Sequence, residues 1–348
     1  MVRKVRIGNR WVGEGEPAYI IAEVGSNFDG DLEQAKRMVD LSKEVGADAV
    51  KFQSFKPEQI IAREGFTRQV SFQAAWKKPV WDVYREAMFP REWHRTVADY
   101  CRAVGIDFFS APYDREAVGL LMELDVPVFK IGSGDITFLS LLEYIARQGK
   151  PLILATGAST MAEIDEAVRV IRGAGNEQLI LLQCITNYPS PFDQANIRAM
   201  VTLRDAFQVP VGYSDHAPGS VVPLGAVALG ACVIEKHFTH DKSHPGPDHP
   251  FAMDPGEFRS MVRDIRLLEQ ALGSSVKEVV PAEAETVVIQ RRSLYAAQDI
   301  PAGARIEEQM VEALRPAEGL LPKEIARVIG RTAQRAIRRG ALITWDMV

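Results

Sequence analysis

The 348-residue sequence has little cysteine, no excess of basic residues and no long apolar run, and each absence argues against a class of protein. Its three cysteines (Cys101, Cys184 and Cys232) lie in apolar surroundings without CxxC spacing, which indicates reduced thiols in a cytoplasmic protein rather than a disulfide framework. The net charge of −5 argues against binding to nucleic acid or to an anionic membrane. No apolar run reaches the roughly 18 residues of a membrane span, and we expect no signal peptide.

What the sequence does contain is a regular alternation of short apolar runs and amphipathic segments. The runs predict strands of the buried parallel type, and the segments between them predict helices, with Asp31 and Thr160 as N-caps. We expect strands at 18–23, 49–53, 107–110, 126–130, 151–155 and 179–183, and two more within 211–237. We expect helices at 32–45, 91–104, 115–124, 139–148, 161–172, 221–229 and 255–272. No GxGxxG follows the first strand, so the pattern favours an α/β protein with a (β/α)8 TIM barrel over an open dinucleotide-binding sheet.

Three segments depart from this alternation. Residues 54–90 carry Phe66, Phe72, Trp76 and Trp81 among many charges, and they are too long for a simple turn. We interpret them as a functional excursion over one face of the barrel. The barrel domain is expected at 1–272 and a linker at 273–290. Residues 291–348 are expected to form a small β-rich domain, because residues 299–311 and 336–348 repeat one short pattern.

In a barrel of this kind, functional groups lie at the carboxyl ends of the strands. Charged or hydrogen-bonding side chains stand at all eight predicted ends, which random loop composition does not explain well. They are Glu23, Lys51, Gln53, Ser110, Lys130, Ser133, Asp135, Thr156, Gln183, Asn187, Tyr188, Ser214, Asp215, His216, Glu235 and His237.

Two histidines end adjacent predicted strands. A single barrel histidine is more often a core or capping residue than a ligand, but His216 and His237 at neighbouring ends favour a divalent metal site with open positions. Asp248 would add a carboxylate and favour a hard ion such as Mn²⁺. His240, His244 and His249 are interpreted as loop residues.

Two lysines lie within or just after apolar strands, where an unpaired charge is costly. Lys51 and Lys130, with the hydroxyls of Ser133, Thr156 and Ser214, predict an anion site for a small phosphorylated acid. Glu23 and Glu235 have two interpretations that the sequence leaves open. They would move a proton and orient a hydroxyl, or they would form structural ion pairs with Lys51 and Lys236.

Nine motifs occur in an order that resembles the sialic acid synthase family. They are IAEVGSN, AVKFQ, FFSAP, FKIGSGD, LATG, NYPSP, GYSDH, IEKHF and GPDH. This family includes the N-acetylneuraminate, legionaminate and pseudaminate synthases and spore-coat polysaccharide biosynthesis protein E. The tail, from RRSLYAAQDIPAG to AIRRG, is similar to the family's antifreeze-like SAF domain.

The resemblance implies a phosphoenolpyruvate-dependent transferase of surface polysaccharide biosynthesis. Such an enzyme condenses phosphoenolpyruvate with an N-acetylated amino-sugar aldehyde and water, giving a 2-keto-3-deoxy nonulosonate and phosphate. It also implies a homodimer in which the SAF domain of one subunit closes the barrel of the other.

The site residues that the resemblance implies fall into four groups. The catalytic residues are Glu23, Lys51, Lys130 and Glu235. Phosphoenolpyruvate is bound by Lys51, Lys130, Ser133, Asn187 and Ser214. The sugar is bound by Gln53, Asp135, Tyr188, Asp248 and Arg315. The metal, Mn²⁺ with Mg²⁺ or Co²⁺ as alternatives, is bound by His216 and His237.

Several positions differ from the pattern common in the family. Phe28 stands where a histidine is frequent, Ala111 and Ala155 replace hydroxyl residues, and Asp135 stands where glutamate is frequent. These changes leave the sugar open and keep a non-catalytic sugar-binding or partner-binding protein as one alternative. A two-histidine hydrolase is a second alternative, but such barrels usually carry HxH after the first strand, and this chain has Glu23-Val24-Gly25 there.

Overall fold

The computed structural model describes residues 2–65, 73 and 76–348, and it divides into two compact units, 1–273 and 274–348. Phe66 and Phe72 of the predicted excursion lie outside the described residues. Within the described part of the chain, no helix is long and apolar enough to cross a bilayer.

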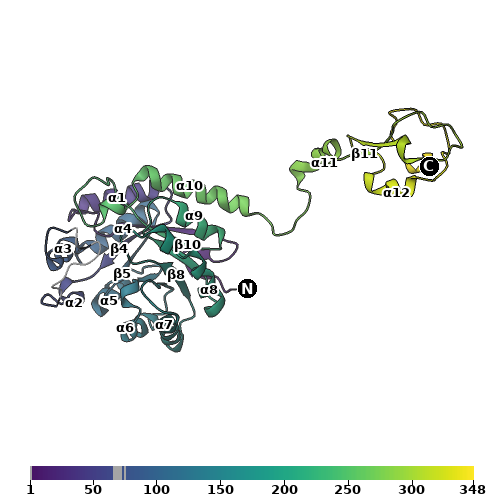
Figure 1. The fold of residues 1–348 in the computed structure, drawn as a ribbon. Coiled ribbons are helices and arrows are strands. Elements are labelled where there is room, and N and C mark those ends of the chain that lie inside the picture. Colours follow the sequence, from purple (N-terminus) through teal and green to yellow (C-terminus); the bar gives the residue numbers. More distant parts are fainter. Residues whose placement is uncertain (1, 66–72, 74–75) are drawn as a thin grey trace. The chain divides into compact units, whose positions relative to one another are not determined.

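The first unit is built around a nearly closed barrel of eight parallel strands (Figure 1). The strands are β3 (Tyr19–Glu23), β4 (Ala49–Ser54), β5 (Asp107–Pro112), β6 (Phe129–Ile131), β7 (Leu152–Ala155), β8 (Leu179–Cys184), β9 (Val211–Asp215) and β10 (Val233–His237). Hydrogen bonding runs in the order β5-β4-β3-β10-β9-β8-β7-β6, and β5 lies beside β6 where the circle closes. The predicted (β/α)8 TIM barrel is confirmed.

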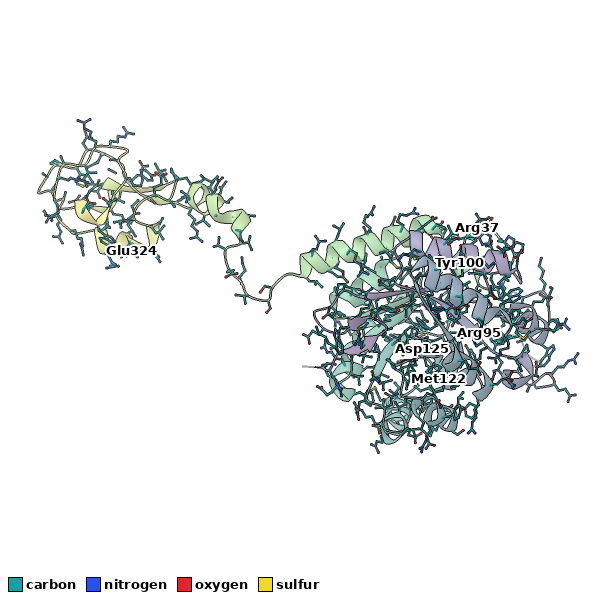
Figure 2. The ribbon with its side chains drawn as sticks, turned by 180° about the vertical axis from the view of Figure 1, so that it is seen from behind. Arg37, Arg95, Tyr100, Met122, Asp125 and Glu324 are labelled. Atoms are coloured by element: carbon teal, nitrogen blue, oxygen red, sulfur yellow. The ribbon has the colours of Figure 1, made fainter. Side chains whose placement is uncertain are left out.

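Helices surround these strands on the outside of the barrel (Figure 1). They are α1 (Leu32–Glu44), α4 (Trp93–Val104), α5 (Arg115–Glu123), α6 (Leu139–Ala146), α7 (Met161–Gly173), α8 (Ile197–Phe207), α9 (Val221–Ala228) and α10 (Pro255–Leu272). The predicted caps are present, since Asp31 accepts from the first turn of α1 and Thr160 with Glu163 forms a capping box on α7. On the face shown in Figure 2, α4 is tied to α1, because Tyr100 donates a hydrogen bond to Asp40 at 2.9 Å.

Helix α8 and an N-terminal hairpin are additions to the predicted elements. Strands β1 (Val5–Ile7) and β2 (Arg10–Val12) pair antiparallel across Gly8 and Asn9. Gly8 has φ +55°, a conformation that glycine adopts without steric cost. The excursion at 54–90 carries two short helices, α2 (Pro57–Ile60) and α3 (Val80–Ala87).

The strand register decides which side chains meet at the mouth of the barrel. Glu23 is level with Lys51 on β4 and with His237 on β10, and Glu235 is level with Ser214 on β9. Because carboxyl ends of parallel strands meet at one edge, these residues form a single polar ring above an apolar core.

The second unit begins with residues predicted as a linker, of which Ala284–Gln290 form helix α11. Its strands β11 (Ser293–Ala296) and β12 (Val311–Leu314) pair antiparallel, and helix α12 spans Ile325–Val328. The two copies of the sequence repeat meet each other, because Ile300 and Ile337 exchange both backbone hydrogen bonds at 2.8 Å. Each copy places a glycine of positive φ, Gly303 or Gly340, at the same position of its turn.

Candidate active site

Two buried lysines and two buried glutamates form the floor of the barrel mouth. Lys51 Nζ lies 2.6 Å from Glu23 Oε2 and 4.0 Å from Glu235 Oε2, and Lys130 Nζ lies 2.9 Å from Glu235 Oε1. All four residues are at most 5% exposed. Buried charges of this kind persist because each sign compensates the other.

The same contacts shift the pKa values of Glu235 and Lys51. Burial alone would raise the pKa of Glu235, but Lys130 and Lys51 together lower it to about 2. Burial alone would lower the pKa of Lys51, but Glu23 and Glu235 raise it above its ordinary value. Glu235 and Lys51 are therefore both charged at neutral pH.

Hydroxyl groups surround this charged floor. Ser214 Oγ donates to Glu235 Oε1 at 3.1 Å, and Ser133 Oγ accepts from the backbone N–H of Gly157 at 2.9 Å. Asn187 lies in the loop after β8, half-buried, with its amide 3.3 Å from the carbonyl of Pro189. The alternative ion pair between Glu235 and Lys236 is not formed, because Lys236 bonds to Asp215 and to the carbonyl of Ala217.

His216 and His237 lie side by side at the ends of β9 and β10, with ring centroids 5.4 Å apart. Two imidazoles on one ion, with bonds of about 2.05 Å and a tetrahedral angle, place their centroids about 5 Å apart. His216 Nδ1 donates to the carbonyl of Ile185 at 2.8 Å, and burial next to His237 lowers the pKa of His216 to about 3. His216 is therefore neutral and keeps Nε2 as an electron-pair donor.

His237 gives independent support for a metal. Its Nδ1 is buried and has no hydrogen-bond partner among the described residues. Buried polar nitrogens are rarely left this way, so a ligand at this atom would remove a cost. The histidine pair therefore fits the divalent ion that the sequence predicts.

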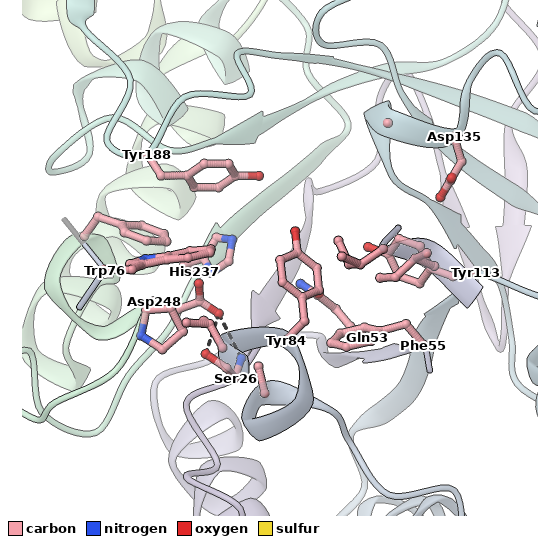
Figure 3. A pocket seen from close by; sticks show the side chains of 17 residues that line it. Ser26, Gln53, Phe55, Trp76, Tyr84, Tyr113, Asp135, Tyr188, His237 and Asp248 are labelled. Atoms are coloured by element: carbon pink, nitrogen blue, oxygen red, sulfur yellow. Dashed lines mark hydrogen bonds between the residues drawn. The ribbon is translucent and has the colours of Figure 1, made fainter. Parts of the chain in front are cut away.

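A cavity of about 370 Å³ opens beside His237 (Figure 3). The predicted residues Gln53, Asp135, Tyr188, His237 and Asp248 all line it. Gln53 donates to Glu23 Oε1 at 2.6 Å and so connects the cavity to the charged floor. The volume and the mixture of polar and aromatic walls suit a small polar molecule.

The polar groups of the cavity differ in how they are held. Asp248 Oδ2 accepts from the backbone N–H of Ser26 at 2.9 Å and from its hydroxyl at 2.8 Å, as the dashed lines in Figure 3 show. Asp135 is different, because burial raises the pKa of its carboxyl to about 6. Tyr188 packs on His216, with centroids 4.1 Å apart, and burial raises its pKa well above the ordinary value.

Several lining residues were not among the predicted site residues. Phe55, Trp76 and Tyr84 all belong to the predicted excursion, but only Trp76 was singled out there. Tyr113 and Phe251 lie outside it and were not singled out. Tyr84 lies on α3, so the segment between β4 and α4 does supply one wall of the cavity. A further cluster joins Asp29 to His244 and His249, the two histidines being interpreted from the sequence as loop residues. The side-chain ligand atoms of the three residues lie within 4.8 Å of one another.

The residues that differ from the pattern common in the family lie in different parts of the barrel. Phe28 is fully buried and packs edge-on against Phe89 and Trp93, so it belongs to the core. Ala111 and Ala155 are buried near the ends of β5 and β7. Arg315 is exposed after β12 in the second unit.

The fold and this ring of residues define an α/β-barrel protein with a floor of paired lysines and glutamates and a histidine pair beside a polar cavity. Comparison with known proteins places it more narrowly. The model of the NeuB family matches residues 38–277, and that of the SAF domain matches residues 291–348.

Relatives match over nearly the whole chain. An uncharacterised protein of Methanocaldococcus jannaschii is 41% identical, covering 99% of this chain and 98% of its own. The N,N'-diacetyllegionaminic acid synthase of Legionella pneumophila is 37% identical, covering 97% and 96%. The crystal structure of the N-acetylneuraminic acid synthetase of Leptospira borgpetersenii, in complex with citrate, has a TM-score of 0.74 at 33% identity, covering 82% and 96%. The chain belongs to the NeuB family and carries a C-terminal SAF domain.

Proposed function

We propose that this protein is a metal-dependent synthase that condenses phosphoenolpyruvate with the open-chain form of an N-acetylated amino sugar. The product is a sialic-acid-like nonulosonate for surface polysaccharide, and phosphate is released. The observation that carries the proposal is the placement of two buried lysines, two buried glutamates and two histidines at one barrel mouth beside a polar cavity.

The lysines bind the phosphorylated acid in this proposal. Lys51 and Lys130 supply two positive charges, and Ser133, Ser214 and Asn187 supply hydrogen bonds to the phosphate or carboxylate. Fixing both ends of phosphoenolpyruvate presents one face of its double bond, which lowers the barrier mainly through orientation.

His216 and His237 would hold the divalent ion, and Mn²⁺ is the proposed metal. When bound, it supplies Lewis-acid activation of the sugar carbonyl. The neutral state of His216 and the unpartnered Nδ1 of His237 support this role.

The cavity residues bind the sugar. Gln53, Asp135, Tyr188 and Asp248 offer donors and acceptors for hydroxyl and acetamido groups. The names of the relatives refer to legionaminic and neuraminic acids, so the class of substrate is an N-acetylated hexosamine or its diacetamido deoxy counterpart.

The reaction forms one bond between C3 of phosphoenolpyruvate and the sugar carbonyl carbon. Water adds its oxygen to C2, the bond between C2 and the phosphate oxygen breaks, and phosphate leaves. Positive charge develops at C2 during these changes. Glu235, whose pKa the lysines lower, and Glu23 would stabilise this charge, and one of the two would accept the proton of the attacking water.

The active assembly is proposed to be a homodimer with exchanged SAF domains. Arg315 of one subunit would then complete the sugar site in the barrel of its partner. The support for this step is the resemblance to the family, together with the exposure of Arg315 on a separately folded unit.

Phosphate release tests the proposal. The protein is incubated with phosphoenolpyruvate, Mn²⁺ and a panel of N-acetylated hexosamines, and we expect phosphate release that depends on one of the sugars. His237→Ala should lower turnover at least a hundredfold while leaving thermal unfolding near that of the wild type. Absence of phosphate with every sugar, together with no metal-dependent thermal shift that His237→Ala removes, would favour the non-catalytic alternative.

A further inference from the structure

A second cluster of metal-ligating side chains lies outside the proposed active site. It joins two loops, because Asp29 follows β3 while His244 and His249 follow β10. His249 is fully buried, whereas Asp29 and His244 line a hollow that opens to solvent. Pro247 lines both this hollow and the main cavity, so the two sites lie on either side of one loop segment.

Asp29 meets one histidine with each of its carboxylate oxygens. His249 Nε2 lies 2.8 Å from Oδ1, and His244 Nε2 lies 3.6 Å from Oδ2. Ligand atoms around a tetrahedral ion with bonds of about 2.05 Å are roughly 3.3 Å apart, so small side-chain rotations suffice. The ring centroids of His244 and His249 are 5.0 Å apart, a separation similar to the 5.4 Å of His216 and His237.

The hydrogen bonds near His249 Nδ1 favour a cation at the other ring nitrogen, Nε2. Thr239 Oγ1 accepts from the backbone N–H of Asp241 and lies 3.1 Å from the carbonyl of Asp241 and 2.6 Å from His249 Nδ1. A hydroxyl has one hydrogen, so all three contacts are hydrogen bonds only when Nδ1 carries a proton and donates it to Thr239. Whenever Nε2 carries no proton, its lone pair faces Asp29 Oδ1 at 2.8 Å, and a cation bound by both atoms removes the repulsion between them.

The backbone also holds His249 in place. A Cβ atom on Gly246 would lie 2.5 Å from His249 Cδ2, so the loop packs directly on the imidazole. A buried histidine fixed by a hydrogen bond at one nitrogen is the usual arrangement for a metal ligand. The exposed His244 and the open hollow leave an entry path and room for a water ligand.

We propose that Asp29, His244 and His249 form a second divalent-cation site. Two imidazoles and one carboxylate suit a borderline transition metal such as Zn²⁺, Co²⁺ or Ni²⁺. The ion would join the loop after β3 to the loop after β10. Those loops also carry Ser26 and Asp248, whose hydrogen bonds shape the main cavity.

Metal content measures this site directly. The full-length protein is dialysed against Zn²⁺, washed in metal-free buffer and analysed by atomic emission. We expect two ions per chain in the wild type, one in His216→Ala/His237→Ala, and none when His244→Ala is added to that double variant. Co²⁺ in the double variant should give visible absorption bands of a tetrahedral nitrogen–oxygen site, and these bands should disappear with Asp29→Asn.

Ser243→Ala is the matched control, because Ser243 is an exposed residue of the same loop that bonds only within it, to Asp241. It should keep both ions. Thermal unfolding of the His216→Ala/His237→Ala protein should shift upward with Zn²⁺, and His244→Ala should remove the shift. The proposal is wrong if the His216→Ala/His237→Ala protein binds no ion, since a proton between Asp29 and His249 would then explain the geometry. It is equally wrong if His244→Ala and Asp29→Asn retain the wild-type ion content.

Discussion

Asp135 is the cavity carboxyl whose pKa burial moves closest to neutrality, to about 6 from an ordinary value of 3.8. A folded-state pKa above the unfolded value means that the folded protein holds this proton more tightly. The stability of the wild type should therefore fall as pH rises from about 4 to about 6, and a variant with an uncharged amide at this position would lack that dependence.

We predict that Asp135→Asn unfolds at a higher temperature than the wild type at pH 7, by about 4 °C, with a difference that shrinks between pH 6 and pH 4. Thermal unfolding across this pH range measures it. The same substitution should raise KM for the sugar at pH 7 through loss of an anionic acceptor. A temperature difference that does not change with pH would show that Asp135 is not the group responsible.

At the residue scale, many side chains of the site were predictable because they follow apolar runs, and the carboxyl ends of the corresponding strands converge in a barrel. Lys51, Lys130, His216 and His237 each follow a recognisable apolar run, and the barrel brings those ends together. Asp29 and His249 are 220 positions apart, and no run or spacing relates them. Their contact depends on how two loops fold, which apolar patterning does not encode.

Alanine substitutions at two glycines of the loop after β3 distinguish the cost of backbone strain from the effect of displacing Asp248. Gly25 and Gly30 have φ values of +55° and +67°, where an L-residue costs roughly 1–2 kcal/mol. A Cβ at Gly25 would lie 2.5 Å from Asp248 Oδ2, whereas a Cβ at Gly30 would meet nothing within 4 Å.

Gly25→Ala should therefore displace Asp248 from Ser26 and lower kcat/KM at least tenfold. Gly30→Ala should lower the free energy of unfolding by the roughly 1–2 kcal/mol of backbone strain, with little effect on kcat/KM. Denaturant unfolding and steady-state kinetics of both variants measure these effects. Equal kinetic losses in the two would indicate that backbone strain, rather than the position of Asp248, controls activity.

At the element scale, the strands were predictable because continuous apolar runs bounded by loops are typical of buried parallel strands. Helix α8 was not predicted, although Met200, Leu203 and Phe207 recur at helical spacing and Asn196, a residue type preferred at the N-cap, precedes them. The β1–β2 hairpin was missed although the Gly8-Asn9 pair is a recognised two-residue turn.

At the scale of the whole molecule, the proposed exchange of SAF domains has a direct test in mixed dimers. His237→Ala removes a metal ligand from its own barrel, and Arg315→Ala removes the arginine supplied to the partner. A hybrid dimer would contain one barrel with intact histidines that receives an intact Arg315.

We predict that each variant alone is nearly inactive, and that mixing them after dissociation and reassociation restores up to a quarter of wild-type turnover. Activity of the mixture equal to the sum of the separate variants would mean that Arg315 does not act across subunits. Light scattering on the same samples should give twice the chain mass of 38.6 kDa.

The internal repeat of the second unit was readable from the sequence because equivalent residues recur at a fixed shift of 37 positions. In the structure these equivalents pair, as Ile300 does with Ile337. Each copy also contains one turn of 3-10 helix at the same position, Glu308–Met310 or Trp345–Met347. In a unit this small, turns and isolated bridges suffice to enclose the few apolar side chains of the core.

In the proposed reaction, water attacks C2 of phosphoenolpyruvate after the sugar carbonyl has been activated, rather than attacking phosphorus as in a metal-dependent phosphatase. The most direct measurement is turnover in ¹⁸O-labelled water, with mass spectrometry of the released phosphate. Attack at C2 breaks the bond between carbon and oxygen, so the phosphate should leave with its original four oxygens and carry no label. Phosphate that contains one ¹⁸O atom, formed with or without sugar, would contradict the proposed function.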